Sequence, residues 1–310
     1  MEKMKQNSNI YIVKLFLKSI AIVTFLMLLF PACSDLVADI ELPDSEPKIV
    51  AHSFICPADS AVMALLTWSN PINSNQSHSN PKIIENAVVK IAEKGGVFSN
   101  LTFYPERKLY SLSTDIFPII AGKSYVLKVE LPDGQSVEAE CYVPGKNETL
   151  ELKEAKVVQY NEYERAFQVE YTFDDNGSAE TYYYSAAYLD SRFFDYRTLE
   201  WVYYQEQLWP TYGNSYIHAK GERPKTYLIR AETYMYNDEY EEVPYEDDRY
   251  VTLMLLQTDE HYYKYHIDLE FYYPDDFFSE PIHIYSNVKG GRGVFAGYNK
   301  TELKVLVDID

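Results

Sequence analysis

Seven short runs in which apolar and polar residues alternate follow one another in the first half of the chain. In order they are KIVAHSFI, AVMALLTWS, NAVVKIAEK, NLTFYPE, KLYSLS, SYVLKVEL and SVEAECYV. Turn-forming residues separate several of them, as at Gly95, Gly122 and Gly134. Strands of this length and spacing predict an immunoglobulin-like β-sandwich over residues 48–145.

The pattern changes in the second half of the chain. Most of the 30 tyrosines fall here, with acidic residues between them. RAFQVEYTF (165–173) and YVTLMLLQT (250–258) alternate with the period of a strand. We therefore predict a second β-rich domain over residues 150–310, so that the chain is mainly β.

One short helix is predicted near the C-terminus. Thr258 can cap it, and Asp259 and Glu260 would lie in its first turn, where the helix dipole favours anions. YYKYHIDLEFYY follows, and Pro274 would end the helix. A β-strand is the competing interpretation, because tyrosine and phenylalanine favour sheets.

The first 32 residues are typical of a signal peptide. Basic residues precede the apolar run SIAIVTFLMLLF, which is too short to span a bilayer. The run ends in FPAC, which resembles a bacterial lipoprotein signal that is cut before Cys33, whose thiol is then acylated. The alternative is Ala-x-Ala-type cleavage with a free cysteine. Residues 33–47, acidic and containing two prolines, would form a tether.

Charge and cysteine content narrow the classes of partner. The net charge of −19 argues against nucleic acid, because a polyanion would be repelled. Besides Cys33, the chain has Cys56 and Cys141, at opposite ends of the predicted sandwich. Whether these two form a disulfide is left open, because paired and reduced buried thiols are both ordinary in an exported protein.

No pattern of catalytic residues stands out. The sequence has no G-x-S-x-G elbow, no H-E-x-x-H helix and no G-x-x-x-x-G-K-[ST] loop. The glycines of SNVKGGRGVFAGYNK (286–300) join two strand-like runs, so we interpret them as a turn that closes the second domain. His261 and His266 are poorly spaced for one metal, and the acidic stretch 238–248 lacks the glycine of an EF-hand. We expect no enzyme activity, cofactor or metal.

The segment WVYYQEQLWPTYGNSY (201–216) is the most suggestive of binding. Its rings include Trp201, Tyr203, Tyr204, Trp209 and Tyr212, with glutamines between them. Flat rings stack on sugars or apolar ligands, and aromatic residues also anchor protein–protein contacts. The same rings equally fit the core of the second domain, so ligand binding, partner contact and core packing all stay open.

Several segments carry a family resemblance. They are IELPDSEPKIVAHSFI, IIENAVVKIAEKGG, IIAGKSYVLKVELPDGQSVEAECYVP, TDEHYYKYHIDLE and FFSEPIHIYSNVKGGRGVFAGY. In this order and spacing they resemble the Bacteroidota lipoproteins grouped as domain-of-unknown-function family 4249. The resemblance implies an outer-membrane location and a TonB-dependent transporter as a partner. It brings no catalytic residues with it.

The expected function is that of a non-enzymatic, lipid-anchored outer-membrane protein. It would bind a glycan or peptide ligand, or act as the accessory partner of a TonB-dependent transporter. The alternatives are a structural or adhesive surface protein and, from another class, a hydrolase that uses the acidic stretch 238–248. Ser34-Asp35 after the lipidated cysteine favours exposure on the cell surface over the periplasmic face.

Overall fold

The computed structural model describes residues 46–69, 82–162, 164–195, 197–235, 249–272 and 283–307. Residues Glu46–Asp310 form one compact unit. The predicted signal peptide, Cys33, the tether before Glu46 and the acidic stretch 238–248 lie outside the described residues.

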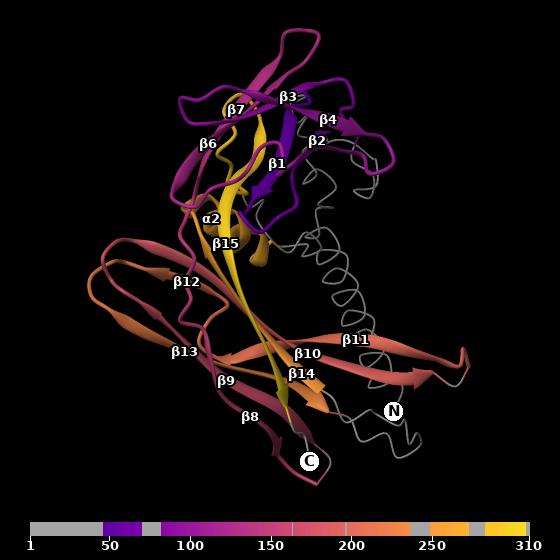
Figure 1. Ribbon diagram of the computed structural model, residues 1–310, viewed down its shortest axis with the longest axis vertical. Helices are drawn as coiled ribbons and strands as arrows, with labels where there is room; N and C mark the ends of the chain where they lie inside the picture. The colour runs from indigo at the N-terminus through magenta and orange to yellow at the C-terminus, as the bar shows by residue number, and fades with distance from the viewer. Residues whose placement is uncertain are drawn as a thin grey trace, which may run out of the picture. The chain divides into compact units, whose positions relative to one another are not determined.

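The chain is mainly β, as predicted, with 15 strands and one α-helix in its described part (Figure 1). All seven strands predicted for the first half are present. They are β1 (Ile49–Ile55), β2 (Ala61–Trp68), β3 (Val88–Glu93), β4 (Ser99–Tyr104), β5 (Leu109–Ser113), β6 (Lys123–Glu130) and β7 (Ser136–Val143).

Strand β4 joins two sheets in this half. Residues 99–101 pair with β3, and residues 102–104 pair with β5. One sheet therefore has the order β7-β6-β3-β4 and the other the order β4-β5-β2-β1. Every second side chain of β7 is buried, and buried side chains of both sheets meet in one hydrophobic cluster, the first core. The alternation in the sequence thus reflects one buried face per strand.

The second half supplies the remaining strands and the helix. They are β8 (Glu151–Gln159), β9 (Arg165–Asp175), β10 (Thr181–Asp195), β11 (Glu200–Tyr212), β12 (Tyr216–Ala219), β13 (Lys225–Met235), β14 (Arg249–Thr258), α2 (Glu260–Glu270) and β15 (Arg292–Val307). The order is β15-β14-β10-β11-β13-β9-β8, and β12 also pairs with β10. Phe167, Phe173, Leu189 and Leu253 belong to a separate hydrophobic cluster, the second core.

Strand β15 connects the two halves. Its first part pairs in parallel with β1, from Val50 opposite Arg292 to Ile55 opposite Gly297. Its second part pairs antiparallel with β14. Phe295 is accordingly part of the first core, and Val307 is part of the second core. One continuous sheet therefore runs through both halves, and the last strand of the chain completes the first core.

The glycine-rich stretch lies where β15 enters the first half. Gly293 has a φ of +105°, and a Cβ atom there would overlap the backbone of Ala51 in β1. A Cβ on Gly297 would overlap the backbone of Tyr142 in β7. The glycines thus allow close backbone approach beside the first core, whereas the sequence pattern predicted a turn that closes the second domain.

Helix α2 begins one residue later than predicted. Its N-cap is Asp259, whose side chain accepts a hydrogen bond from the backbone nitrogen of Tyr262, while Thr258 is the last residue of β14. The helix ends at Glu270, before the predicted stop. A carboxylate is as good a cap as a hydroxyl, which the sequence alone could not distinguish here.

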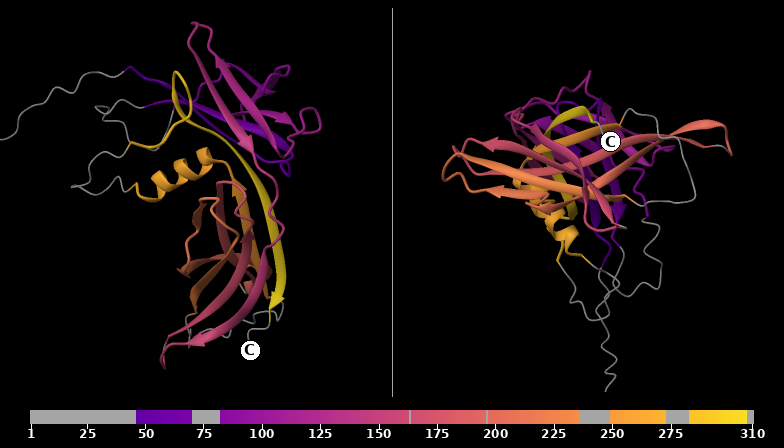
Figure 2. Two further views of the ribbon diagram at one scale, coloured as in Figure 1. Left: turned by 90° about the vertical axis from the view of Figure 1, so that its left-hand side faces the viewer. Right: turned by 90° about the horizontal axis from the view of Figure 1, so that it is seen from below.

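The helix contacts β15, β10 and β14 and lies to one side of β15 (Figure 2). Five rings form what we call the helix cluster: Phe54, Tyr216, Tyr262, Tyr265 and His266. The rings of Tyr262 and His266 stack with centroids 4.0 Å apart, and Phe54 of β1 lies 5.3 Å from His266. Tyr216 of β12 stacks on His266 at 6.2 Å. The cluster therefore holds strands of both halves against one helix.

Candidate functional site

The aromatic segment 201–216 forms most of β11, which runs with β10 as a two-stranded ribbon at one side of the second half (Figure 1). The exposed fractions of the five proposed side chains are 40 % for Trp201, 80 % for Tyr203, 52 % for Tyr204, 66 % for Trp209 and 58 % for Tyr212. These side chains lie on the surface, so core packing does not explain them. Leu208 is the buried residue of this strand.

The pleat of β11 divides these rings between two faces. Trp201, Tyr203 and Trp209 share one face with Gln205 and Gln207, because successive side chains of a strand point to opposite sides. We call this face, together with the residues opposite it on β10, β14 and β15, the aromatic face. Tyr204 points to the other side, with the buried Leu208. A register shift between Pro210 and Tyr212 interrupts the alternation before Tyr212.

A polar centre lies on the aromatic face beside the rings. Asp190 of β10 accepts hydrogen bonds from Gln205 Nε2 at 2.6 Å and from Thr252 Oγ1 at 2.6 Å. Lys304 Nζ lies 3.0 Å from Asp190 Oδ2. Burial alone would raise the pKa of Asp190, but these hydrogen bonds and the Lys304 charge outweigh it and lower that pKa. Four strands thus hold one carboxylate in its charged form.

Two cations lie over rings of this face. The Arg192 guanidinium lies 5.1 Å from the ring centroid of Trp201, and Lys304 Nζ lies 4.9 Å from that of Tyr250. Both are cation–π contacts, which fix the orientation of a ring and partly satisfy the charge. Trp201 and Tyr250 are therefore held in place, whereas Tyr203 and Trp209 present the most exposed rings.

A second candidate is a cleft of about 950 Å³ near the N-terminus of α2. Its lining includes the carboxyl groups of Glu148, Asp174, Asp175, Glu180 and Glu260 and the ammonium groups of Lys146 and Lys225. The buried Asp175 accepts hydrogen bonds from Thr181 and Tyr183. Asp174 and Glu260 also have partners, Thr226 and Lys264. Internal contacts thus occupy most of these carboxylates.

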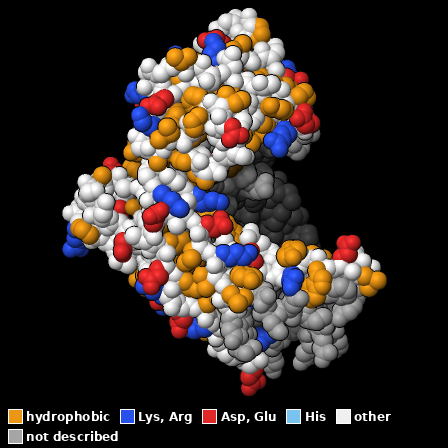
Figure 3. Space-filling view, in the orientation of Figure 1, with side chains coloured by type: hydrophobic (Ala, Val, Ile, Leu, Met, Phe, Trp, Pro, Cys, Tyr) orange, Lys and Arg blue, Asp and Glu red, His pale blue; other side chains and the backbone are white. Residues whose placement is uncertain are grey.

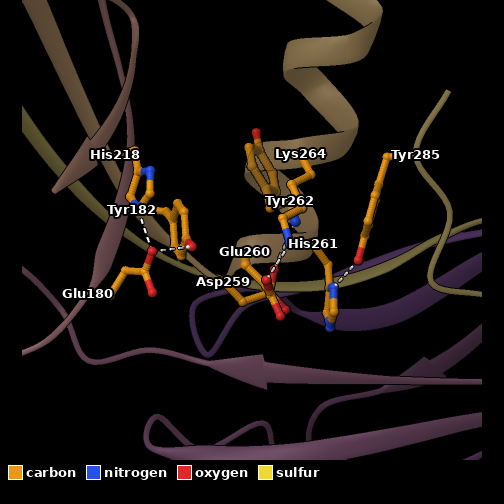
Figure 4. Close-up of polar contacts among 9 residues, drawn as sticks. All are labelled: Glu180, Tyr182, His218, Asp259, Glu260, His261, Tyr262, Lys264 and Tyr285. Atoms are coloured by element: carbon orange, nitrogen blue, oxygen red, sulfur yellow. Dashed lines mark hydrogen bonds and ion pairs between the residues drawn. The ribbon is translucent and has the colours of Figure 1, made fainter. Parts of the chain in front are cut away.

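Asp259 is a second buried carboxyl group of this region, and it lies at the start of α2 (Figure 4). Besides capping the helix, it accepts hydrogen bonds from the backbone nitrogens of Tyr142 at 3.2 Å and Gly297 at 3.1 Å. Burial raises its pKa to about 7, against the opposing effect of these three donors. Asp259 therefore fastens α2, β7 and β15 together, and its oxygens point at backbone rather than at open solvent.

The other titratable groups at this end of α2 bind one another (Figure 4). Glu180 accepts from Tyr182 at 3.0 Å and contacts His218 Nε2 at 2.5 Å, and the bond with His218 lowers the pKa of Glu180. His261 Nδ1 lies 2.7 Å from the Tyr285 hydroxyl. These pairs are suited to holding neighbouring elements in place rather than to activating a nucleophile.

Neither of the two cysteines in the described residues is placed for nucleophilic chemistry. Cys56 and Cys141 are free, buried thiols, and burial raises the pKa of each. A raised pKa keeps a thiol protonated and unreactive at neutral pH. Among the described residues, no three His, Cys, Asp or Glu side chains gather closely enough to hold a metal ion.

Sequence reasoning found the rings but missed the polar centre. Asp190, Thr252 and Lys304 come from three strands that are distant in sequence, and no local pattern marks them. Asp259 was expected only in the first turn of the helix. Its bonds to β7 and β15 depend on tertiary packing.

Comparison with known proteins places the chain in a family. In the described part of the chain, no helix is long and apolar enough to cross a membrane. No curated protein matches the sequence. Residues 37–304, which include every described strand except the last residues of β15, match the family model described as Domain of unknown function (DUF4249). The chain therefore belongs to the DUF4249 family.

Proposed function

We propose that this chain is a non-enzymatic, lipid-anchored protein of a bacterial outer membrane that binds through its aromatic face, as the accessory of a TonB-dependent transporter. The observation that carries the proposal is the exposure of Tyr203 and Trp209 on a strand whose neighbours fix a charged polar centre. Large exposed rings are the side chains that most often anchor binding.

The contacts of the titratable groups near α2 support a binding role over an enzymatic one. The carboxyl, imidazole and phenol groups near α2 bind one another or the backbone, as the contacts of Asp259 and Glu180 illustrate. A catalytic group instead needs to reach a reacting atom. The stretch 238–248, which a hydrolase would use, lies outside the described residues.

The lipid anchor rests on the sequence around Cys33. Several acyl chains on one cysteine would hold the protein stably, since a single chain binds a membrane only marginally. Cys33→Ser should move the protein from the outer-membrane fraction to the soluble fraction. Retention of the variant in the membrane fraction would contradict this part of the proposal. Protease treatment of intact cells then distinguishes the cell surface from the periplasmic face.

Partner binding is tested by purifying the full chain in detergent and identifying co-purifying proteins by mass spectrometry. We expect a TonB-dependent transporter with the wild type and its loss with the double variant Tyr203→Ala/Trp209→Ala. Tyr104→Ala is the control, because Tyr104 is exposed, at 42 %, and belongs to β4 in the first half of the chain. Equal recovery of the transporter with all three proteins would rule out the aromatic face as its binding surface.

A further inference from the structure

We propose that the aromatic face binds a neutral polysaccharide, with Asp190 and Gln205 as its hydrogen-bonding centre and Tyr203 and Trp209 as its stacking rings. This inference rests on the proposed function, since it names the ligand class of the same surface.

The charges of the aromatic face are already paired. Lys304 contacts Asp190, Arg192 lies over Trp201, and Lys300 contacts Glu302 at 3.1 Å. The whole chain carries a net charge of −19, whereas the charged groups named here are three cations and two carboxylates. On the side of the molecule seen in Figure 3, basic and acidic side chains likewise lie next to one another over much of the second half. An ionic ligand would find few charges on this face that lack a partner, whereas a neutral ligand needs none.

The hydrogen-bonding groups of the polar centre are held in place, and they can still form further hydrogen bonds. Asp190 takes one amide hydrogen of Gln205, which sets the plane of that amide. A glutamine amide has a second hydrogen and an oxygen to offer, and a carboxylate can accept about four hydrogen bonds. Three groups contact Asp190. Sugar hydroxyls, which both donate and accept, complement such a centre.

The rings supply the apolar contact that a sugar also needs. One face of a pyranose presents C–H groups, which pack against a flat ring, while its hydroxyls lie at the rim. Tyr203 and Trp209 are the most exposed of the five rings, at 80 % and 66 %. Six residues of a strand span about 20 Å. One sugar cannot touch both rings, so the geometry favours a chain of several sugars lying along β11.

The test is affinity electrophoresis of the full chain in native gels that contain laminarin, xylan or mannan as neutral polysaccharides, or polygalacturonate as an anionic one. We expect retardation by at least one neutral polysaccharide, unchanged by added salt, since no ion pair forms with the ligand. Tyr203→Ala and Trp209→Ala should each weaken binding about tenfold or more, as removal of an anchoring ring does. Gln205→Ala should also weaken it, whereas Tyr104→Ala should not.

Each outcome decides between the proposals. Retardation by none of the neutral polysaccharides, or equal retardation of the wild type and the ring variants, overturns the inference. Retardation only by polygalacturonate overturns it as well, in favour of an anionic ligand. If the ring variants lose the transporter but the wild type binds no polysaccharide, the proposed function stands and the inference fails. If the wild type binds neither, both fail.

Discussion

The helix cluster and the aromatic face are built from the same kinds of side chain but have opposite surroundings. Tyr262 contacts three other rings, those of Phe54, His266 and Tyr298. Tyr203 is 80 % exposed. An aromatic-rich segment is therefore not by itself a sign of binding or of packing. The helix cluster differs from the aromatic face because other strands pack against its rings. Residues of β1, β12 and β15 contact the rings of α2.

The largest predicted difference in stability is between variants of two aspartates, Asp259 beside the helix and Asp190 on the aromatic face. Asp259 accepts three backbone hydrogen bonds and is 6 % exposed, whereas Asp190 is held by three side chains. Asp259→Ala leaves one buried and two part-buried N–H groups without this partner, and we expect a loss of about 3 kcal/mol in the free energy of unfolding. Asp190→Ala should cost about 1 kcal/mol. Urea denaturation measures both, and equal losses would contradict the contrast between the regions.

Two tyrosines give the next largest effect. Tyr262→Ala removes a ring from the helix cluster, and we expect a loss of about 2 kcal/mol in unfolding free energy. Tyr203→Ala removes an exposed ring, so its unfolding free energy should change by less than about 0.5 kcal/mol. Thermal and urea unfolding of the two variants test this pair. A destabilised Tyr203→Ala variant would show that the ring packs against something in the native protein.

The dependence of stability on pH also separates the two aspartates. Burial lowers the pKa of His52, His261 and His266. On acidification these histidines are therefore protonated in the unfolded chain before they are protonated in the folded chain, and stability falls as the pH drops below about 6.5. The pKa of Asp259 is raised to about 7, so its contribution is present below about pH 4 and is lost as the pH rises to 7. The two trends oppose each other between about pH 4 and 6.5.

Asp259→Asn should therefore steepen the loss of stability on acidification, because only the histidine trend remains. Asp190→Asn is the control. The pKa of Asp190 is lowered, so its contribution falls only at pH values below its unfolded pKa of about 4. Urea midpoints measured between about pH 5 and 7 distinguish these cases. An unchanged slope in Asp259→Asn would mean that Asp259 is charged throughout this range.

The smallest predicted effect concerns Lys304. Its side chain is 52 % exposed, and exposed ion pairs contribute about 0.5 kcal/mol. Lys304→Ala should lower the unfolding free energy by no more than this. An effect above about 2 kcal/mol would place Lys304 among the structural contacts instead.

The sequence predicted local features of the fold well and tertiary ones poorly. The seven strands of the first half follow from alternation, because each buries one face. The insertion of β15 beside β1 could not be read from either strand, since parallel pairing of distant segments leaves no local pattern. Local patterns also identified the rings of β11. They did not show whether these rings are exposed and did not mark Asp190, because both depend on contacts between distant strands.

The close approach of β15 to β1 has a consequence for folding kinetics. The first strand in the described residues finds its parallel partner only at the far end of the chain, from Val50 opposite Arg292 onward. Pairings between distant segments close long loops and slow folding. The first core, which needs Phe295, cannot be completed while the C-terminal residues are still being synthesised. A chain of this design therefore stays incompletely folded until its last strand has been synthesised.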